Sequence, residues 1–219
     1  MNKKSTAFKA AIFDLDGTLA DSLQVWGRID LEFFELHGLT LPEDYHHAIK
    51  SMGFPQAAAY TKDRFALPHT EEEIIRQWME MARNEYAERV ALKDGAQEYL
   101  CALKNAGVKI GLATASGPEL FEPLLKRHDV YDFFSAFVTT DRAGKDKTSP
   151  DVYLLCAKEL GCKAEDCMVY EDLLIAMRTA KKAGMAVTGV YDPHWSAEQM
   201  LIEASADRYL HSFLEALPL

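Results

Sequence analysis

The residues Ala10-Ala11-Ile12-Phe13-Asp14-Leu15-Asp16-Gly17 place a short apolar run directly before two acidic side chains and a glycine. Four consecutive apolar residues are typical of a strand that is buried on both faces. Open sheets of parallel strands bind their ligands at the carboxyl ends of the strands. Asp14 and Asp16 would lie at that end, where Gly17 lets the chain turn away sharply. We therefore expect this stretch to begin an α/β domain and to carry its chemistry.

Downstream of this stretch, the sequence alternates between strand and helix patterns. Four further apolar runs predict strands at 108–113, 136–139, 167–170 and 186–190. Helical spacing of apolar residues predicts helices at 96–105, 119–128, 150–160, 173–183 and 196–204. This alternation predicts an α/β fold with a Rossmann-like parallel sheet and helices on both faces.

An all-helical block interrupts the alternation just after the first strand. We expect helices at 21–37, 42–50, 55–65 and 71–89, the last with Thr70 as its N-cap. We therefore assign residues 1–17 and 92–219 to an α/β catalytic core. Residues 18–91 form an inserted all-helical cap domain in this prediction.

The composition excludes several classes of protein. The chain has 219 residues, of which 48% are hydrophobic and 26% charged, and its formal net charge is −10. This balance is that of a globular protein, and the negative charge disfavours nucleic acid and membrane surfaces as partners. The four cysteines form no CxxC pair, and we interpret them as reduced thiols. No apolar stretch reaches the length of a signal peptide core or a membrane span, so we expect a cytoplasmic protein. We expect it to be a monomer or a weak dimer.

Acidic residues end two of the predicted strands. Glu171 and Asp172 follow the strand at 167–170, as Asp14 and Asp16 follow the first one. Carboxylates beside a buried apolar run cost free energy unless positive charge neutralises them. Hard oxygen ligands of this kind suit Mg²⁺ better than zinc or copper. One carboxylate could attack as a nucleophile and a second could act as general acid and base.

Two other loops carry groups that suit a phosphate. The stretch 112–117, Leu-Ala-Thr-Ala-Ser-Gly, ends a strand in hydroxyls and small residues ahead of a helix. Hydroxyls and free amides at a helix N-terminus can hold phosphate oxygens. The stretch 144–151, Gly-Lys-Asp-Lys-Thr-Ser-Pro-Asp, is a basic loop whose lysine could hold a phosphate and offset the aspartates.

Each of these patterns, taken singly, also has a purely structural explanation. Aspartates form Asx turns and N-caps, a serine before a helix is an ordinary N-cap, and surface lysines are usually solvated. All four patterns lie beside predicted strands, however, so a parallel sheet would bring them to one edge. That convergence favours one active site over four independent structural roles.

Together, the four motifs resemble those of the haloacid dehalogenase-like hydrolase superfamily, in particular its helical-cap phosphatases and beta-phosphoglucomutase-like members. The matching stretches are DLDGTLADS (14–22), LATAS (112–116), KTSPDVYLLCAKELG (147–161) and VYEDLLIAMRTAKKAGM (169–185). The helical block between the first two motifs resembles the helical cap of that family.

The resemblance implies a Mg²⁺-dependent phosphatase that hydrolyses small, sugar phosphate-like metabolites through an aspartyl phosphate. It implies Asp14 as the nucleophile and Asp16 as the general acid and base. The implied phosphate-binding residues are Thr114, Ala115 through its backbone, and Lys147. The implied metal ligands are Asp14, Asp16 through its carbonyl, and Asp172, with Glu171 close by.

The sequence departs from the family pattern at three positions. They are Leu173 in place of a common serine, Ala176 in place of a common glycine, and Thr148 in place of a common proline. Lys145 offers a second register for the motif lysine, but Ser-Pro-Asp after Lys147 aligns with the family pattern. Dehalogenases of the superfamily lack the aspartate found here at Asp16, so its presence favours phosphate esters.

The cap is expected to select the substrate. Its candidate contacts are Arg28, Lys50, Ser51, Met52 and Gly53. The resemblance leaves a hexose phosphate mutase as an alternative, although the cap has no clear arginine-rich match to the mutase pattern. A phosphonate hydrolase that uses a cap lysine as a Schiff base fits less well. The lysine near the right loop, Lys50, precedes Met52-Gly53, whereas the family pattern places it after them. A binding protein without turnover is the non-enzyme alternative, which the retained Asp14 and Asp16 disfavour.

Overall fold

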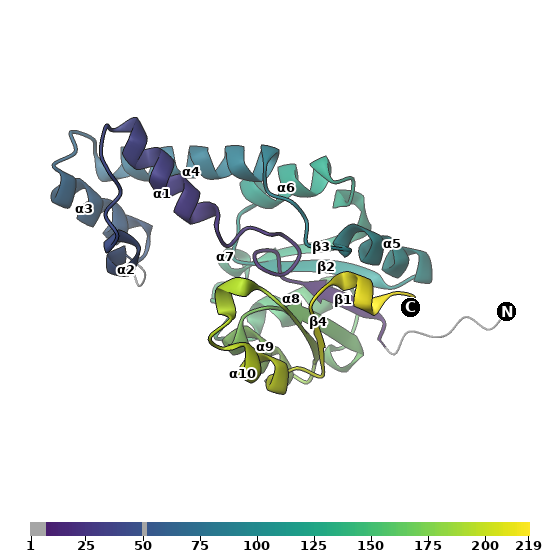
Figure 1. Ribbon diagram of the computed structural model, residues 1–219. Coiled ribbons are helices and arrows are strands. Elements are labelled where there is room, and N and C mark those ends of the chain that lie inside the picture. Colours follow the sequence, from purple (N-terminus) through teal and green to yellow (C-terminus); the bar gives the residue numbers. More distant parts are fainter. Residues whose placement is uncertain (1–7, 50–51) are drawn as a thin grey trace. The chain divides into compact units, whose positions relative to one another are not determined.

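The computed structural model describes residues 8–49 and 52–219 (Figure 1). Within these described residues, six strands form one sheet in the order β3-β2-β1-β4-β5-β6, and every neighbouring pair is parallel. The strands are β1 (Ala10–Phe13), β2 (Lys109–Thr114), β3 (Phe134–Thr139), β4 (Cys167–Glu171), β5 (Ala186–Val190) and β6 (Arg208–Leu210). The α/β fold with a Rossmann-like sheet is therefore confirmed.

Helices connect the strands and make up the inserted block. The α-helices are α1 (Val25–Leu36), α2 (Tyr45–Ile49), α3 (Phe54–Phe65), α4 (Glu71–Glu88), α5 (Ala96–Ala106), α6 (Pro118–Arg127), α7 (Thr140–Ala143), α8 (Asp151–Glu159), α9 (Leu174–Lys182) and α10 (Gln199–Ser205). Short 3-10 turns are η1 (Tyr131–Phe133), η2 (Ala164–Asp166), η3 (Pro193–Trp195) and η4 (Phe213–Ala216). None of the described helices is both long and apolar enough to cross a membrane.

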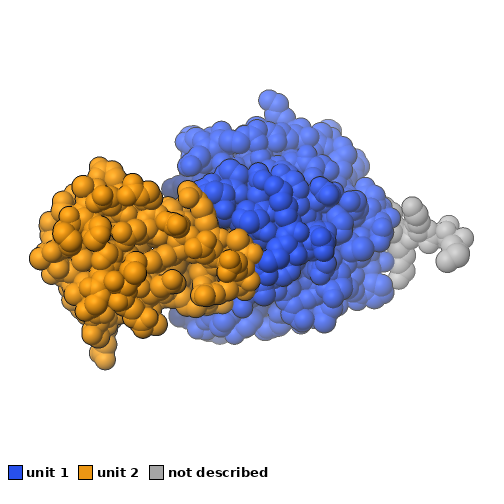
Figure 2. All heavy atoms as spheres, turned by 90° about the horizontal axis from the view of Figure 1, so that it is seen from above, with its two compact units in different colours: residues 1–23, 90–219 blue, residues 24–89 orange. Residues whose placement is uncertain are grey.

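The chain divides into two compact units, residues 1–23 with 90–219 and residues 24–89 (Figure 2). The sequence analysis predicted a longer inserted unit, residues 18–91, than the 24–89 found in the structure. The difference arises because the segments that lead into and out of the inserted unit, residues 18–23 and 90–93, pair with each other inside the first unit. The Lys93 amide donates to the Leu19 carbonyl at 2.8 Å, and the Asp21 amide donates to the Ala91 carbonyl at 2.9 Å.

Both faces of the sheet are covered in the first unit. Helices α8, α9 and α10 lie on one face, and α5 and α6 lie on the other (Figure 1). Phe13 of β1 stacks on Tyr170 of β4 with ring centroids 4.3 Å apart, and Tyr99 of α5 stacks on Phe213 at 5.6 Å. Strand β1 is buried and lies between β2 and β4, so the loop that follows it begins at the centre of the sheet.

The second unit has its own aromatic core. Phe33 of α1 packs against Trp78 of α4, with ring centroids 5.5 Å apart. Helix α4 begins at the predicted N-cap, where the Thr70 hydroxyl accepts from the Glu73 amide at 3.2 Å and the Glu73 carboxylate accepts from the Thr70 amide at 2.8 Å. Helix α1 begins at Val25, later than expected, because the chain before it is part of the first unit.

Candidate active site

The two acidic motifs meet because their strands are neighbours in register. Phe13 of β1 pairs with Tyr170 of β4, so Asp14 and Glu171 come next on adjacent strands. The Asp14 amide donates to the Tyr170 carbonyl at 3.0 Å, which extends the ladder by one step. Asp14, Glu171 and Asp172 are all buried, and an oxygen of each lies within 4.8 Å of the others.

Lys147 joins this cluster from the loop before α8. Its ammonium donates to Asp14 Oδ1 and to Glu171 Oε1, the latter at 2.5 Å. The Tyr153 hydroxyl, one turn into α8, donates to the same Glu171 oxygen at 2.6 Å. Lys145 instead lies on the surface, 3.9 Å from Asp151. Of the two registers considered from the sequence, the structure brings Lys147 to the cluster.

The cluster contains more acidic side chains than basic ones. Burial raises the pKa of Asp14 well above its ordinary value, Lys147 opposes that rise, and Glu171 and Asp172 add to it. Burial and the Glu171 charge raise the pKa of Asp172 to about 7. Burial alone would lower the pKa of Lys147, but Asp14 and Glu171 raise it above its ordinary value, so the ammonium stays charged. Full ionisation of the three carboxyl groups beside the one ammonium would leave a formal charge of −2, which burial and mutual repulsion oppose.

The residual charge and the donor set fit a divalent cation. The three carboxylates offer hard oxygens, as magnesium, calcium and manganese prefer, and they offer no thiolate or imidazole. Buried carboxylates in excess of their cationic partners are costly unless a further positive charge lies among them. Asp14, Asp172 and Glu171 could therefore hold a divalent metal ion.

Asp16 lies beside the cluster but in a different environment. It is partly exposed, and two hydroxyls hold its carboxylate: Ser22 donates to Oδ1 and Ser116 donates to Oδ2, each at 2.6 Å. Ser116 follows β2, so this bond ties the second motif to the first. A carboxylate that is fixed by hydroxyls yet open to solvent is suited to exchange a proton with a bound molecule.

The phosphate-binding candidates of the second motif lie at the end of β2, next to β1. Thr114 is buried, and its hydroxyl accepts from the Ser116 amide at 3.0 Å. Ala115 is exposed directly after the strand. Their contact with phosphate remains a prediction.

Several polar partners at this edge were not predicted from the sequence. Thr18 donates to Asp172 Oδ1 at 2.8 Å, and the Trp195 indole donates to Asp172 Oδ2 at 2.5 Å. The quoted motifs contain four of these polar partners, so their side chains could have been predicted to contact the site: Thr18, Ser22, Ser116 and Tyr153. Trp195 lies in a separate loop and carried no such signal.

Gly17 allows the first motif to pass close to Asp172. Its φ is +82°, and a Cβ added there would lie 2.8 Å from Asp172 Cγ and 2.9 Å from Leu23 Cδ1. We expect Gly17→Ala to destabilise the fold by about 2–5 kcal/mol, through left-handed strain plus overpacking. Gly144 is the matched control, because its φ is +74° but no heavy atom lies within 4 Å of the added Cβ. Gly144→Ala should cost only about 1–2 kcal/mol in urea unfolding. Equal losses for both variants would contradict the steric argument.

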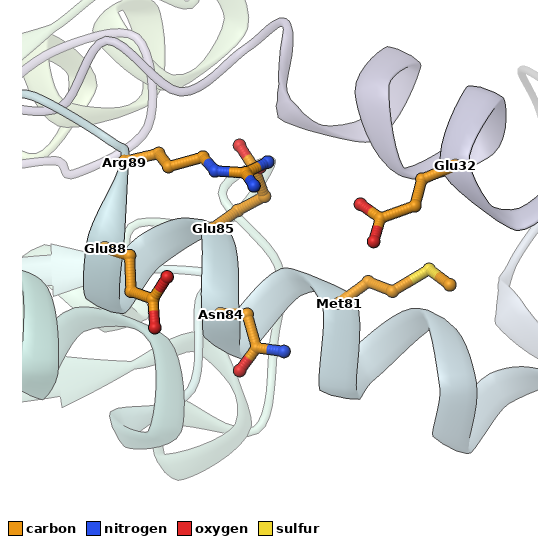
Figure 3. A pocket seen from close by; sticks show the side chains of 6 residues that line it. All are labelled: Glu32, Met81, Asn84, Glu85, Glu88 and Arg89. Carbon is orange, nitrogen blue, oxygen red and sulfur yellow. The ribbon is translucent and has the colours of Figure 1, made fainter.

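The cap candidates lie in the second unit. Arg28 donates twice to Glu85 Oε2, at 2.9 and 2.7 Å, and Glu85 also pairs with Arg89, the C-cap of α4, at 2.7 Å. Figure 3 shows the Arg89 guanidinium beside the Glu85 carboxylate. Arg28 is therefore engaged in the cap itself, and its contact with substrate remains a prediction. Lys50 and Ser51 lie outside the described residues.

Met52 and Gly53 line a pocket of about 340 Å³ in the second unit. The other lining residues are Trp26, Asp30, Ile49, Phe54, Ala57 and Trp78. Most of these side chains are apolar, so the pocket is suited to the less polar part of a small molecule.

Asp30 is a buried carboxylate in that pocket, with its Oδ2 3.0 Å from His46 Nδ1. Burial raises its pKa to about 6, and His46 opposes the rise. Because the folded pKa of Asp30 exceeds the ordinary one, its ionisation destabilises the fold. This penalty is absent below about pH 4, grows as the pH rises, and is complete above about pH 6. We expect Asp30→Asn to raise the free energy of unfolding at pH 8, by at most about 3 kcal/mol.

Urea unfolding at pH 8 and pH 4 tests this expectation. Asp44→Asn is the control, because the hydrogen bond from Arg64 lowers the pKa of the exposed Asp44 and no gain should follow. A gain for Asp30→Asn that is as large at pH 4 as at pH 8 would contradict the burial argument.

Comparison with known proteins agrees with this geometry. A family model described as haloacid dehalogenase-like hydrolase matches residues 11–190. The chain belongs to the haloacid dehalogenase-like hydrolases. "Putative phosphatase YhcW" of Bacillus subtilis (strain 168) is 32% identical over 182 residues, covering 81% of this chain and 80% of that protein. Hexitol phosphatase B of Escherichia coli (strain K12) is 29% identical over 180 residues, covering 80% of each chain.

A solved structure extends the likeness of this haloacid dehalogenase-like hydrolase to nearly the whole chain. The crystal structure of CbbY from Rhodobacter sphaeroides in complex with phosphate has a TM-score of 0.77 and 28% sequence identity, and the match covers 97% of both chains. The predicted family is therefore confirmed. The roles of individual residues in the site remain predictions.

Proposed function

We propose that this hydrolase is a Mg²⁺-dependent phosphatase that cleaves phosphate monoesters of small metabolites. The observation that carries the proposal is the convergence of Asp14, Asp16, Asp172 and Lys147 on one edge of the sheet. A buried carboxylate beside a lysine, a hydroxyl-bound carboxylate and a cation-binding cluster are the parts that phosphoryl transfer needs.

Asp14 is the nucleophile in the proposed reaction. One of its carboxylate oxygens attacks phosphorus while the bond between phosphorus and the alcohol oxygen breaks. Asp16 gives its proton to that leaving oxygen. Asp16 then takes a proton from water as the water oxygen attacks the aspartyl phosphate, which releases inorganic phosphate and restores the Asp14 carboxylate. Hydrogen bonds from the Ser22 and Ser116 hydroxyls hold the Asp16 side chain in place during both steps.

Lys147 supplies positive charge to Asp14 and to the transferred group. Thr114 and the Ala115 backbone are proposed to hold phosphoryl oxygens at the end of β2. Asp14, Asp172 and the Asp16 carbonyl would bind Mg²⁺, with Glu171 nearby. When bound, the cation neutralises phosphoryl charge that would otherwise repel Asp14. The family resemblance is the reason for proposing Mg²⁺ as the divalent metal, and the hard carboxylate oxygens are ligands that Mg²⁺ accepts.

The proposed substrate class is a sugar phosphate or similar small ester. A relative named hexitol phosphatase B supports this choice. Met52 and Gly53 are the described cap candidates for contact with the part of the substrate that is not phosphate.

Phosphate release from a metabolite panel tests the proposal. The panel holds sugar phosphates, phosphoglycolate, nucleotides and a chromogenic phosphate ester, each with Mg²⁺ and with EDTA. Wild type should release phosphate only with Mg²⁺, and Asp16→Asn, purified in the same way, should release at least about 10²-fold less. If wild type released phosphate from no member of the panel, the proposal would be contradicted. Interconversion of sugar phosphate isomers without release would favour the mutase alternative.

A further inference from the structure

Trp195 reaches the acidic cluster from a loop that the proposed reaction does not use. It ends the 3-10 turn η3, which follows β5, and its indole N–H donates to Asp172 Oδ2 at 2.5 Å. The Asp172 side chain is only 2% exposed, and its other oxygen accepts from Thr18 at 2.8 Å. Each oxygen of this carboxylate therefore has its own side-chain donor.

The turn that carries Trp195 is itself anchored. Asp192, 5% exposed, pairs with Lys93 Nζ at 2.5 Å, and the same ammonium donates to the Tyr191 carbonyl at 3.1 Å. Asp192 Oδ1 accepts from the His194 amide at 2.8 Å, and the Asp192 carbonyl accepts from the Trp195 amide at 3.1 Å. Trp195 also packs against the hydrophobic core cluster, whose members include residues of α8, α9 and α10. These contacts fix the position from which the indole N–H is offered.

We propose that Trp195 is a positioning residue that holds the Asp172 carboxylate ready for the divalent cation. Donors on both oxygens restrict rotation of the carboxylate, while each oxygen keeps a further lone pair for a metal ion. The indole N–H is neutral, so it fixes the carboxylate without adding a positive charge that would repel the cation. Without it, Asp172 Oδ2 would lose a buried donor, and cation binding would have to order the side chain.

This inference rests on the cation site of the proposed function, so its test measures metal binding directly. Calorimetric titration of the metal-free full-length chain with Mg²⁺ gives the dissociation constant. We expect Trp195→Phe, which keeps an aromatic ring but removes the donor, to raise that constant at least about tenfold. The matched control is Trp78→Phe, which also removes a buried indole N–H, but one with no hydrogen-bond partner among the described residues. Its Mg²⁺ affinity should equal that of wild type.

A second measurement does not depend on the folding of the Trp195 variant. The chain has three tryptophans, so a Trp26→Phe/Trp78→Phe variant reports Trp195 fluorescence alone. Its emission should change with Mg²⁺ in step with the calorimetric isotherm.

Equal Mg²⁺ affinity of folded Trp195→Phe and wild type would overturn the role of Trp195 but leave the phosphatase proposal intact. An unchanged emission through saturation would also overturn it. Failure of wild type itself to bind Mg²⁺ would overturn both the cation site and this role.

Discussion

Replacement of Asp14 by asparagine is expected to abolish phosphate release while making the metal-free protein more stable. Loss of a nucleophile commonly costs at least about 10⁴-fold in kcat, because the remaining groups cannot form the covalent intermediate. Asparagine has nearly the same shape as aspartate, so the substitution removes charge and nucleophilicity with little change in packing.

The expected gain in stability follows from the crowding of carboxylates. Asp14 is buried against Glu171 and Asp172, and burial raises its pKa well above the ordinary value. A carboxyl group whose folded pKa is raised destabilises the fold as pH rises above its unfolded pKa. Asparagine removes that penalty, and Lys147 keeps its second partner, Glu171, at 2.5 Å. The gain should therefore be present at pH 7 in EDTA and absent below about pH 4, where the carboxyl is protonated in both states.

Thermal unfolding in EDTA at pH 7 and below pH 4, beside a phosphate release assay, checks both halves of this expectation. Asp146→Asn is the matched control, because Asp146 lies next to Lys147 in the same loop but is exposed. Hydrogen bonds from Thr148 lower the pKa of Asp146, so its substitution should give no gain in stability and should leave phosphate release unchanged. An Asp14→Asn protein that still releases phosphate at the wild-type rate would assign the nucleophile elsewhere.

The parts of the site that the sequence predicted are those fixed by local pattern and strand order. Asp14 and Glu171 each follow an apolar strand directly, and parallel neighbours bring their carboxyl ends together. The choice of Lys147 over Lys145 depended on the resemblance of the Ser-Pro-Asp after Lys147 to the family pattern. The short strand β6 was missed because only its last residue, Leu210, is buried, so that Arg208–Leu210 carries no apolar run.

The contacts that the sequence did not predict depend on pairings between distant segments. Trp195 and Asp172 are separated by 23 positions, and a single tryptophan in a loop has no periodicity that would indicate its partner. The sequence predicted Arg28 as a candidate substrate contact and did not indicate its partner Glu85, which lies 57 positions away on another helix. The boundaries of the inserted unit shifted for the same reason, because Leu19 and Asp21 pair with the returning chain.

Replacement of Lys147 by methionine is expected to have the largest effect on stability. Its ammonium, 11% exposed, is shared by Asp14 and Glu171, so methionine would leave three buried carboxylates without that cation. Removing one partner from a buried ion pair typically costs about 3–5 kcal/mol. We expect a loss of this size in EDTA, seen as a fall of roughly 10 °C in melting temperature.

Mg²⁺ should restore part of the stability lost in Lys147→Met, because a divalent cation among the carboxylates replaces the missing positive charge. Activity should stay at least about 10³-fold below wild type even then, since the transferred group also loses its lysine. The matched control is Lys145→Met: Lys145 is exposed and lies 3.9 Å from Asp151, so its loss should change stability by less than about 0.5 kcal/mol. A stable, active Lys147→Met beside a damaged Lys145→Met would reverse the register of the motif. A loss in Lys147→Met that Mg²⁺ leaves undiminished would instead mean that the cation does not bind among these carboxylates.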